Sequence, residues 1–279
     1  MSAPPGATVE REYNLRLAFP DHPQWFARWA DDSAAARLHL AGRLDLRYGS
    51  GPKQTLDVFP SENARGALLF IHGGYWRALD KSEHSFVAPP LVAQGISVAV
   101  INYDLCPQVR IGDIVEQCRE AVAWLHREGA RFGVPAQRLV VAGHSAGGHL
   151  AAMLLATDWR ARGLPGAVAG AVAISGVFDL EPLLQVSFNT DLQLDAAQAR
   201  AMSPIHLELR DPVPLLVAVG ADETGEFIRQ SGALWARWPA CHHAGRDGPL
   251  LIAARHHFSV LSDLGDPNSV LSRAIYSVC

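Results

Sequence analysis

Gly143-His144-Ser145-Ala146-Gly147 is the stretch that decides the fold, because a strand-like run precedes it and a helix-forming run follows it. Residues 138–142 are mostly apolar, as in a short buried strand, and residues 148–155 favour a helix. The pattern predicts a sharp strand-to-helix turn whose small residues avoid clashes and whose serine hydroxyl stands clear of the sheet. The N-terminus of the helix would also stabilise negative charge that develops beside this hydroxyl. Ser145 is therefore the candidate catalytic nucleophile.

A second motif, His72-Gly73-Gly74-Tyr75-Trp76, follows an apolar run at residues 67–71. When a strand-to-helix turn that carries a serine (a nucleophile elbow) lies further along the chain, the loop after this earlier strand can supply backbone N–H groups to an oxyanion hole. Glycines suit that task because they let the backbone approach a substrate closely. A Gly-Gly turn after a strand is also common in its own right. The order of the two motifs favours the catalytic interpretation.

Composition bounds the class of protein. The chain has 279 residues, of which 49% are hydrophobic and 19% charged, and this predicts one large α/β domain over residues 1–279 with a sizeable core. The net charge of −4 gives no reason to expect a nucleic-acid or membrane partner. The longest apolar stretch, residues 164–178, is interrupted by glycines and a proline and is too short to cross a bilayer.

The start of the chain and the cysteines favour a cytoplasmic location. The first residues show no positively charged region followed by an apolar stretch, the pattern that is typical of a signal peptide. The four cysteines have neither metal-ligand nor redox spacing, which is simplest to explain by reduced thiols. Cys118 falls on the apolar face of an expected helix, whereas Cys106 falls on a loop that could line the site.

The order of expected elements predicts a mostly parallel sheet with helices on both faces. An N-terminal helical arm over residues 1–42 precedes a hairpin, and a small helical cap over residues 181–204 interrupts the later alternation. The hairpin joins residues 44–48 and 54–59 through the turn at 49–52. Further strands are expected at 96–101, 138–142, 167–174, 214–219 and 250–254, and helices at 23–38, 111–125, 148–155, around Leu234 and at 269–276.

A serine nucleophile needs a base, and the base needs an orienting acid. If the three catalytic residues occur along the chain in the order serine, acid, histidine, the acid should lie just after a strand. Asp222 and Glu223 both lie just after an expected strand. The histidine should follow the last strand, where His256 and His257 are adjacent. The residues alone leave both choices open.

No histidines and carboxylates have metal spacing such as H-E-x-x-H, so we expect neither a metal nor another cofactor. The other histidines near the two motifs, His72, His144 and His149, are expected to form hydrogen bonds with nearby backbone.

The motif at residues 72–76 resembles the H-G-G-x-W signature of the kynurenine formamidases (arylformamidases), relatives of the hormone-sensitive-lipase-like esterases. Residues 103–107, 143–150, 175–180 and 202–204 also resemble segments of that family. The resemblance implies an α/β-hydrolase fold and hydrolysis of a small formyl-arylamide, N-formyl-kynurenine, to kynurenine and formate. The alternatives are a carboxylesterase acting on short-chain or aryl esters and, with less support, a non-catalytic binding protein of the same fold.

The resemblance also implies a role for individual residues. The family's acid stands four residues before a phenylalanine, which selects Glu223, although this chain has Glu-Thr-Gly where the family more often has Asp-Ser-Pro, so Asp222 stays open. The family's histidine directly precedes a phenylalanine, which selects His257. The oxyanion donors would be Gly74, Tyr75 and Ala146. We expect an aromatic slot for a small-molecule substrate, and a homodimer is compatible with the sequence. The candidates to line the slot are Tyr75, Trp76, Tyr103, Phe188 and Asn189.

Overall fold

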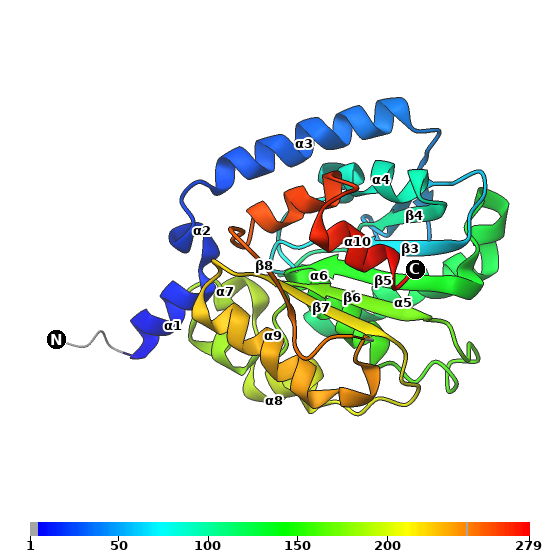
Figure 1. Ribbon diagram of the computed structural model, residues 1–279. Helices are drawn as coiled ribbons and strands as arrows, with labels where there is room; N and C mark the ends of the chain where they lie inside the picture. Colours follow the sequence, from blue (N-terminus) through cyan, green and yellow to red (C-terminus); the bar gives the residue numbers. More distant parts are fainter. Residues whose placement is uncertain (1–4, 244) are drawn as a thin grey trace.

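The strands form one sheet of eight, in the order β1-β2-β4-β3-β5-β6-β7-β8 (Figure 1). A computed structural model describes residues 5–243 and 245–279. The first hairpin is antiparallel, β2 is antiparallel to β4, and the pairs from β4 to β8 are parallel. The strands are β1 (Arg43–Arg47), β2 (Thr55–Phe59), β3 (Gly66–Ile71), β4 (Ile96–Ile101), β5 (Leu139–His144), β6 (Gly170–Ile174), β7 (Leu215–Gly220) and β8 (Leu250–Ile252).

The central strands are buried on both faces, as parallel strands covered by helices must be. Every residue of β3, β4, β5, β6 and β7 is buried, whereas the edge strand β1 is mostly exposed. The expected α/β-hydrolase fold, its hairpin and its mostly parallel sheet are confirmed. Two strands are shorter than predicted: β6 begins at Gly170, and β8 ends at Ile252, two residues before Ala254 adopts a left-handed φ of 56°.

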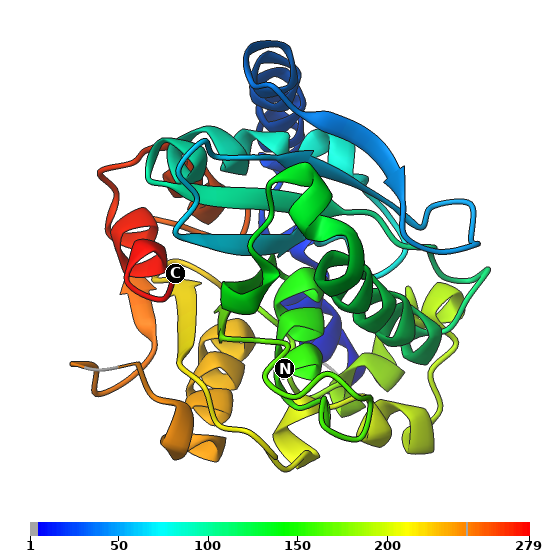
Figure 2. The same cartoon turned by 90° about the vertical axis from the view of Figure 1, so that its right-hand side faces the viewer.

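Helices cover both faces of the sheet (Figures 1 and 2). One face carries α3 (His22–His39), α4 (Ala88–Ala93) and α10 (Val270–Tyr276), and the other carries α5 (Ile111–Glu128), α6 (Ala146–Leu155) and α9 (Gly225–Arg237). The apolar stripe predicted on α5 faces the core, since Ile114, Cys118 and Val122 have no exposed surface. Within the described ranges, no helix has the length and apolar character needed to cross a bilayer.

Short helices at the carboxyl ends of the strands form two coverings over the site. The predicted cap contains η5 (Glu181–Gln185), α7 (Asn189–Leu192) and α8 (Ala196–Ala201), and η6 (Pro204–His206) follows it. The arm begins with α1 (Pro5–Tyr13) and α2 (Leu15–Ala18), and α1 packs against both η5 and α9 (Figure 1). The remaining 3-10 helices are η1 (Lys81–Glu83), η2 (Ser85–Val87), η3 (Gly129–Phe132), η4 (Ala136–Arg138), η7 (Pro239–Cys241) and η8 (Ser259–Gly265).

Candidate active site

Ser145 lies in a sharp turn between β5 and α6. Its backbone has φ 58° and ψ −120°, a left-handed conformation that is rare for a residue with a side chain. A Cβ at Gly147 would lie 1.9 Å from the carbonyl oxygen of Ile71, and a Cβ at Gly143 would lie 2.2 Å from that of Gly147. The glycines on either side of Ser145 are therefore required by close backbone contacts, and the turn has the shape that the motif predicts.

His257 faces Glu223, and the pair is buried. The Nδ1–H of His257 donates to Glu223 Oε2 over 2.8 Å, and the two side chains are only 2% and 0% exposed. The other carboxylate oxygen accepts hydrogen bonds from the Gly220 N–H, at 3.0 Å, and from the Ser175 hydroxyl. These bonds fix the carboxylate, and the carboxylate fixes which ring nitrogen of His257 carries the proton.

The neighbouring acid and histidine have other environments. Asp222 is exposed to solvent. His256 stacks on Phe19, with ring centres 4.6 Å apart, and its Nε2 lies 3.2 Å from Asp21. The structure thus brings together Glu223 and His257, the pair that the family resemblance selects, and leaves Asp222 and His256 apart from them.

Ser145 and His257 line the same cavity. The cavity is narrow, because the centre of a water molecule can reach only about 60 Å³ of it. No hydrogen bond joins Ser145 to the His257 ring in the described parts of the chain, and such contacts often tighten only when substrate binds. Most of the other lining residues come from the arm, from the loop after β3 and from the cap: Asn14, Leu15, Arg16, Phe26, Trp29, Gly74, Tyr75, Arg77, Ala78, Leu79 and Phe188. The last two are His144, at the end of β5, and Phe258, next to His257.

The loop after β3 has an unusual backbone. Gly74, Tyr75 and Trp76 have φ values of 101°, 50° and 55° in succession. A Cβ at Gly74 would lie 2.2 Å from the carbonyl oxygen of Ala78, so only glycine fits there. Among the described residues, none accepts a hydrogen bond from the N–H of Gly74, Tyr75 or Ala146. These three N–H groups are the predicted oxyanion donors; Gly74 and Tyr75 line the cavity together with Ser145, and Ala146 follows Ser145 directly in the chain.

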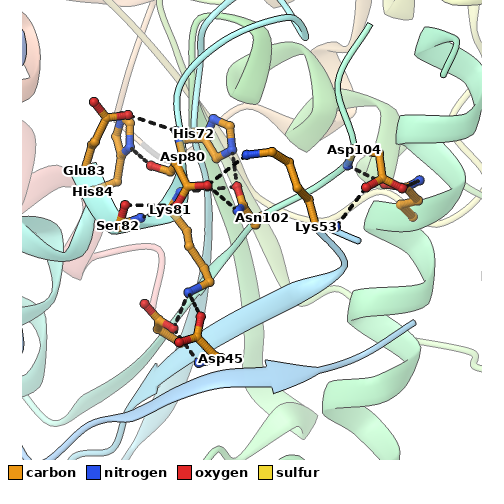
Figure 3. Close-up of polar contacts among 12 residues, drawn as sticks. Asp45, Lys53, His72, Asp80, Lys81, Ser82, Glu83, His84, Asn102 and Asp104 are labelled. Carbon is orange, nitrogen blue, oxygen red and sulfur yellow. Dashed lines mark hydrogen bonds and ion pairs between the residues drawn. The ribbon is translucent and has the colours of Figure 1, made fainter. Parts of the chain in front are cut away.

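A polar cluster that is buried at His72 and Asn102 and partly exposed at Asp80 and Lys53 supports this loop (Figure 3). The two ring nitrogens of His72 lie 2.8 Å from the Gly73 carbonyl oxygen and 3.0 Å from Asn102 Oδ1. Asn102 donates to Asp80 over 2.6 Å, and the ammonium of Lys53 donates to the same carboxylate over 3.0 Å. Burial lowers the pKa of His72 to about 4, so its imidazole is neutral at pH 7.

Two predicted substrate contacts are contradicted by the structure. Tyr103 is fully buried, and its hydroxyl donates to the carbonyl oxygens of His72 and Gly73 over 2.8 and 3.2 Å, so it holds the loop and does not reach the cavity. Asn189 also lies outside the cavity lining, because its side chain accepts from the N–H of Leu194 and donates to the carbonyl oxygen of the same residue within the cap.

The remaining candidates divide between the cavity and the core. Tyr75 and Phe188 line the cavity, with ring centres 4.5 Å apart. Trp76 is fully buried beneath the loop and packs edge-on against His149. Cys106 is buried outside the cavity lining and donates its N–H to the Trp76 carbonyl oxygen over 2.8 Å.

Two buried histidines bond backbone, as predicted. Nε2–H of His144 donates to the carbonyl oxygen of His257 over 2.8 Å, and Nε2–H of His149 donates to that of Met202 over 2.7 Å. Burial and the nearby His257 ring hold the pKa of His144 well below its usual value, and burial lowers that of His149 to about 4. His144, adjacent to the serine, therefore anchors the backbone that carries His257.

The sequence patterns did not predict that residues of the arm line the cavity. Residues Asn14, Leu15 and Arg16 lie around the start of α2, and Phe26 and Trp29 lie on one face of α3. Aromatic residues one helical turn apart were the available signal, because they indicate a face that packs on something. Across 5–243 and 245–279, no group of three or more histidines, cysteines and carboxylates could hold a metal ion.

Comparison with known proteins identifies the family to which the chain belongs. Residues 68–221 match the family described as having the alpha/beta hydrolase fold, so the chain belongs to the α/β hydrolases and is an enzyme of that family. A kynurenine formamidase of Danio rerio is 31% identical over 241 residues, which cover 83% of this chain and 80% of that protein. Within the α/β hydrolases, the chain is therefore kynurenine formamidase-like.

Two further relatives show how far the similarity extends. A kynurenine formamidase of Salmo salar is 34% identical over 67% of this chain and 65% of its own length. A crystal structure from Silicibacter sp. tm1040, provisionally described as a thioesterase, is 34% identical, has a TM-score of 0.85, and covers 96% of this chain and 98% of its own. Proteins named for different activities are thus similar to this chain over most of its length.

Proposed function

We propose that the protein is a serine hydrolase that cleaves N-formyl-kynurenine to kynurenine and formate. The observation that carries the chemistry is that Ser145 and His257 line one cavity with Gly74 and Tyr75, and that Glu223 is bonded to His257. The N–H groups of Gly74, Tyr75 and Ala146 donate to none of the described residues. The substrate is supported by the similarity to proteins named kynurenine formamidase and by the aromatic walls of the cavity.

In the first half of the reaction, His257 Nε2 accepts the proton of the Ser145 hydroxyl as the oxygen attacks the formyl carbon. The carbonyl oxygen of the substrate becomes an oxyanion, which accepts hydrogen bonds from the N–H groups of Gly74, Tyr75 and Ala146. His257 then gives its proton to the arylamine nitrogen as the C–N bond breaks. Kynurenine leaves, and the formyl group remains esterified to Ser145.

In the second half, a water molecule replaces the amine. His257 takes one proton of the water, and the hydroxide attacks the formyl ester. The oxyanion forms in the same place, the serine oxygen recovers a proton from His257, and formate is released. Throughout, Glu223 holds the Nδ1–H of His257 and stabilises the transient imidazolium without accepting its proton.

The shape of the cavity fits a small acyl group on an aromatic amine. Formyl is the smallest acyl group, so it needs the least space in a cavity that is narrow as a whole. Tyr75 and Phe188 offer aromatic surface for the leaving arylamine. We therefore expect turnover of formyl-arylamides and of short-chain aryl esters, and little turnover of long acyl chains, because each added methylene needs further buried space.

A second candidate activity is hydrolysis of esters or thioesters by the same residues. It is supported by the Silicibacter relative, whose crystal structure is provisionally described as that of a thioesterase. The steps would be the same, with an alcohol or a thiol in place of the amine as the leaving group.

A substrate panel separates the two activities. It compares kcat/KM for N-formyl-kynurenine, formanilide, phenyl acetate, phenyl octanoate and an acetyl thioester. We expect N-formyl-kynurenine to rank first and phenyl octanoate last. Turnover of the esters or the thioester without measurable turnover of either formamide would reject the formamidase assignment and favour the second candidate.

A further inference from the structure

The charges around the cavity are one-sided. Its lining includes Arg16 and Arg77, and neither aspartate nor glutamate occurs among its described lining residues. Arg77 is paired with Asp191 of the cap, and its guanidinium carbon lies 5.1 Å from the centre of the Phe188 ring. The charge of Arg77 is therefore already compensated, whereas that of Arg16 is not.

Arg16 presents an uncompensated charge beside an aromatic wall. It is exposed on α2, and its guanidinium carbon lies 5.8 Å from the centre of the Phe26 ring, which also lines the cavity. In the described part of the chain, no carboxylate forms an ion pair with Arg16. A guanidinium over an aromatic face can still offer its N–H fork to an incoming carboxylate.

The acidic residues nearest to Arg16 in the sequence, Glu10, Glu12 and Asp21, are engaged by other groups. Each accepts a hydrogen bond from elsewhere: Glu10 from the Ser187 hydroxyl at 2.7 Å, Glu12 from the Glu226 N–H at 3.1 Å, and Asp21 from the Trp25 indole at 2.9 Å. Arg16 is left available for a ligand in the cavity.

We propose that Arg16 is a specificity-determining residue that binds the carboxylate of an acidic aromatic substrate whose ring lies against the aromatic walls of the cavity. The proposal rests on the proposed function, in which Ser145 attacks an acyl group on that ring. N-formyl-kynurenine has the required chemistry, because its formamide is attached to an aromatic ring whose side chain ends in an amino-acid carboxylate. The arm, and not only the cap, then selects the substrate.

The test compares a charged substrate with a neutral one of the same shape. Steady-state kinetics are measured with N-formyl-kynurenine and with its carboxamide derivative, for the wild type and for Arg16→Gln. Arg16→Gln should raise KM for N-formyl-kynurenine by about fivefold to tenfold, with little change in kcat, because it removes a charge-assisted contact away from the reacting bond. KM for the carboxamide should not change. Added salt should weaken the wild-type preference for the carboxylate.

A control separates a local contact from general surface charge. Arg11→Gln removes another exposed arginine of the arm, on α1 and outside the cavity lining, and should leave both KM values unchanged. Equal changes in KM for the charged and neutral substrates in Arg16→Gln, or no change for either, would overturn the proposal.

The same comparison with an aryl ester pair keeps this inference separate from the formamidase assignment. Wild type and Arg16→Gln are assayed with 4-acetoxybenzoate and 4-acetoxybenzamide. If no formamide is hydrolysed but the wild type prefers the benzoate and Arg16→Gln does not, the formamidase assignment fails and the role of Arg16 stands. If formamides are hydrolysed and Arg16→Gln retains the full preference for the carboxylate in both pairs, the role of Arg16 fails alone.

Discussion

Tyr75 donates a hydrogen bond of 2.6 Å from its hydroxyl to the carbonyl oxygen of Tyr13. Tyr75 belongs to the loop that carries the free N–H donors, and Tyr13 is the last residue of α1 in the arm. Tyr13 is itself anchored, because its hydroxyl donates to Glu226 on α9 over 2.7 Å. One side chain therefore links the loop beside Ser145 to the segment that covers it.

Loss of this link should loosen the arm. Tyr75→Phe removes the hydroxyl and leaves the Tyr13 carbonyl oxygen without its partner, which should lower the free energy of unfolding by about 1–2 kcal/mol. Hydrogen exchange should become faster in residues 8–18, and KM should rise. Tyr276→Phe is the matched control, because the Tyr276 hydroxyl is buried without a partner among the described residues. Unchanged hydrogen exchange in residues 8–18 of Tyr75→Phe would show that this hydrogen bond does not stabilise the arm.

Glu223 and Asp222 should differ sharply in their importance. Glu223→Gln keeps the shape of the side chain but removes the charge that orients His257, so kcat should fall by on the order of 10²- to 10⁴-fold. Asp222→Asn should change kcat less than about threefold, because Asp222 is exposed and Glu223 holds the His257 ring. Steady-state kinetics of the two variants check this. The reverse ranking would mean that the acid acting on His257 during turnover is not the one bonded to it here.

The cluster behind the loop should act through kcat. Burial alone would raise the pKa of Asp80, but hydrogen bonds from Asn102, Ser82 and Lys53 bring it below its usual value. Asp80→Asn would weaken the support of His72 and misplace the oxyanion donors, so kcat should fall about tenfold or more with a smaller change in KM. Asp45→Asn is the control, since Asp45 pairs with Lys81 at the far side of the cluster (Figure 3). Equal losses in both variants would indicate general destabilisation.

The sequence was sufficient to predict the sheet, the elbow and the cap, because each has a local signal. Apolar runs of strand length alternate with amphipathic helices, and the glycines around Ser145 are those that backbone contacts require. The choice of Glu223 over Asp222 had no local signal, because both residues follow β7 and only the packed turn decides which one faces His257. That choice came from the family resemblance; in the structure, Glu223 is the acid that is hydrogen-bonded to His257.

The role of the arm and the inner position of Tyr103 could not be predicted in the same way. Tyr103 follows β4 at the edge where the site lies, so a substrate contact was a reasonable expectation. Its hydroxyl instead satisfies two carbonyl oxygens of the loop after β3, a pairing between segments about 30 residues apart. Likewise, nothing in the arm's own periodicity indicates that Phe26 and Trp29 face a cavity and not the core.

Buried histidines should make the protein less stable in acid. The pKa values of His72 and His149 are lowered by burial to about 4 in the folded protein, whereas unfolding returns them to about 6.5. The unfolded chain therefore binds more protons between these values, so stability is full above about pH 6.5 and is lost as the pH falls toward 4. Each histidine should cost about 2 kcal/mol between pH 7 and pH 5.

Urea unfolding of the wild type and of His149→Gln at these two pH values tests this assignment. Glutamine can still donate to the Met202 carbonyl oxygen but does not titrate, so His149→Gln should show a pH dependence smaller by about 2 kcal/mol. An identical pH dependence in the two proteins would mean that His149 is not a source of the acid sensitivity.

The central claim is that Ser145 is the nucleophile, and covalent labelling tests it most directly. Wild-type protein is treated with paraoxon, and the site and extent of phosphorylation are read by peptide mass spectrometry while the residual activity is measured. We predict one adduct per chain, on Ser145, in proportion to the loss of activity, and no adduct in Ser145→Ala, whose kcat should be lower by roughly 10³-fold or more. An adduct on another residue that accounts for the lost activity, or near-normal kcat in Ser145→Ala, would contradict the account.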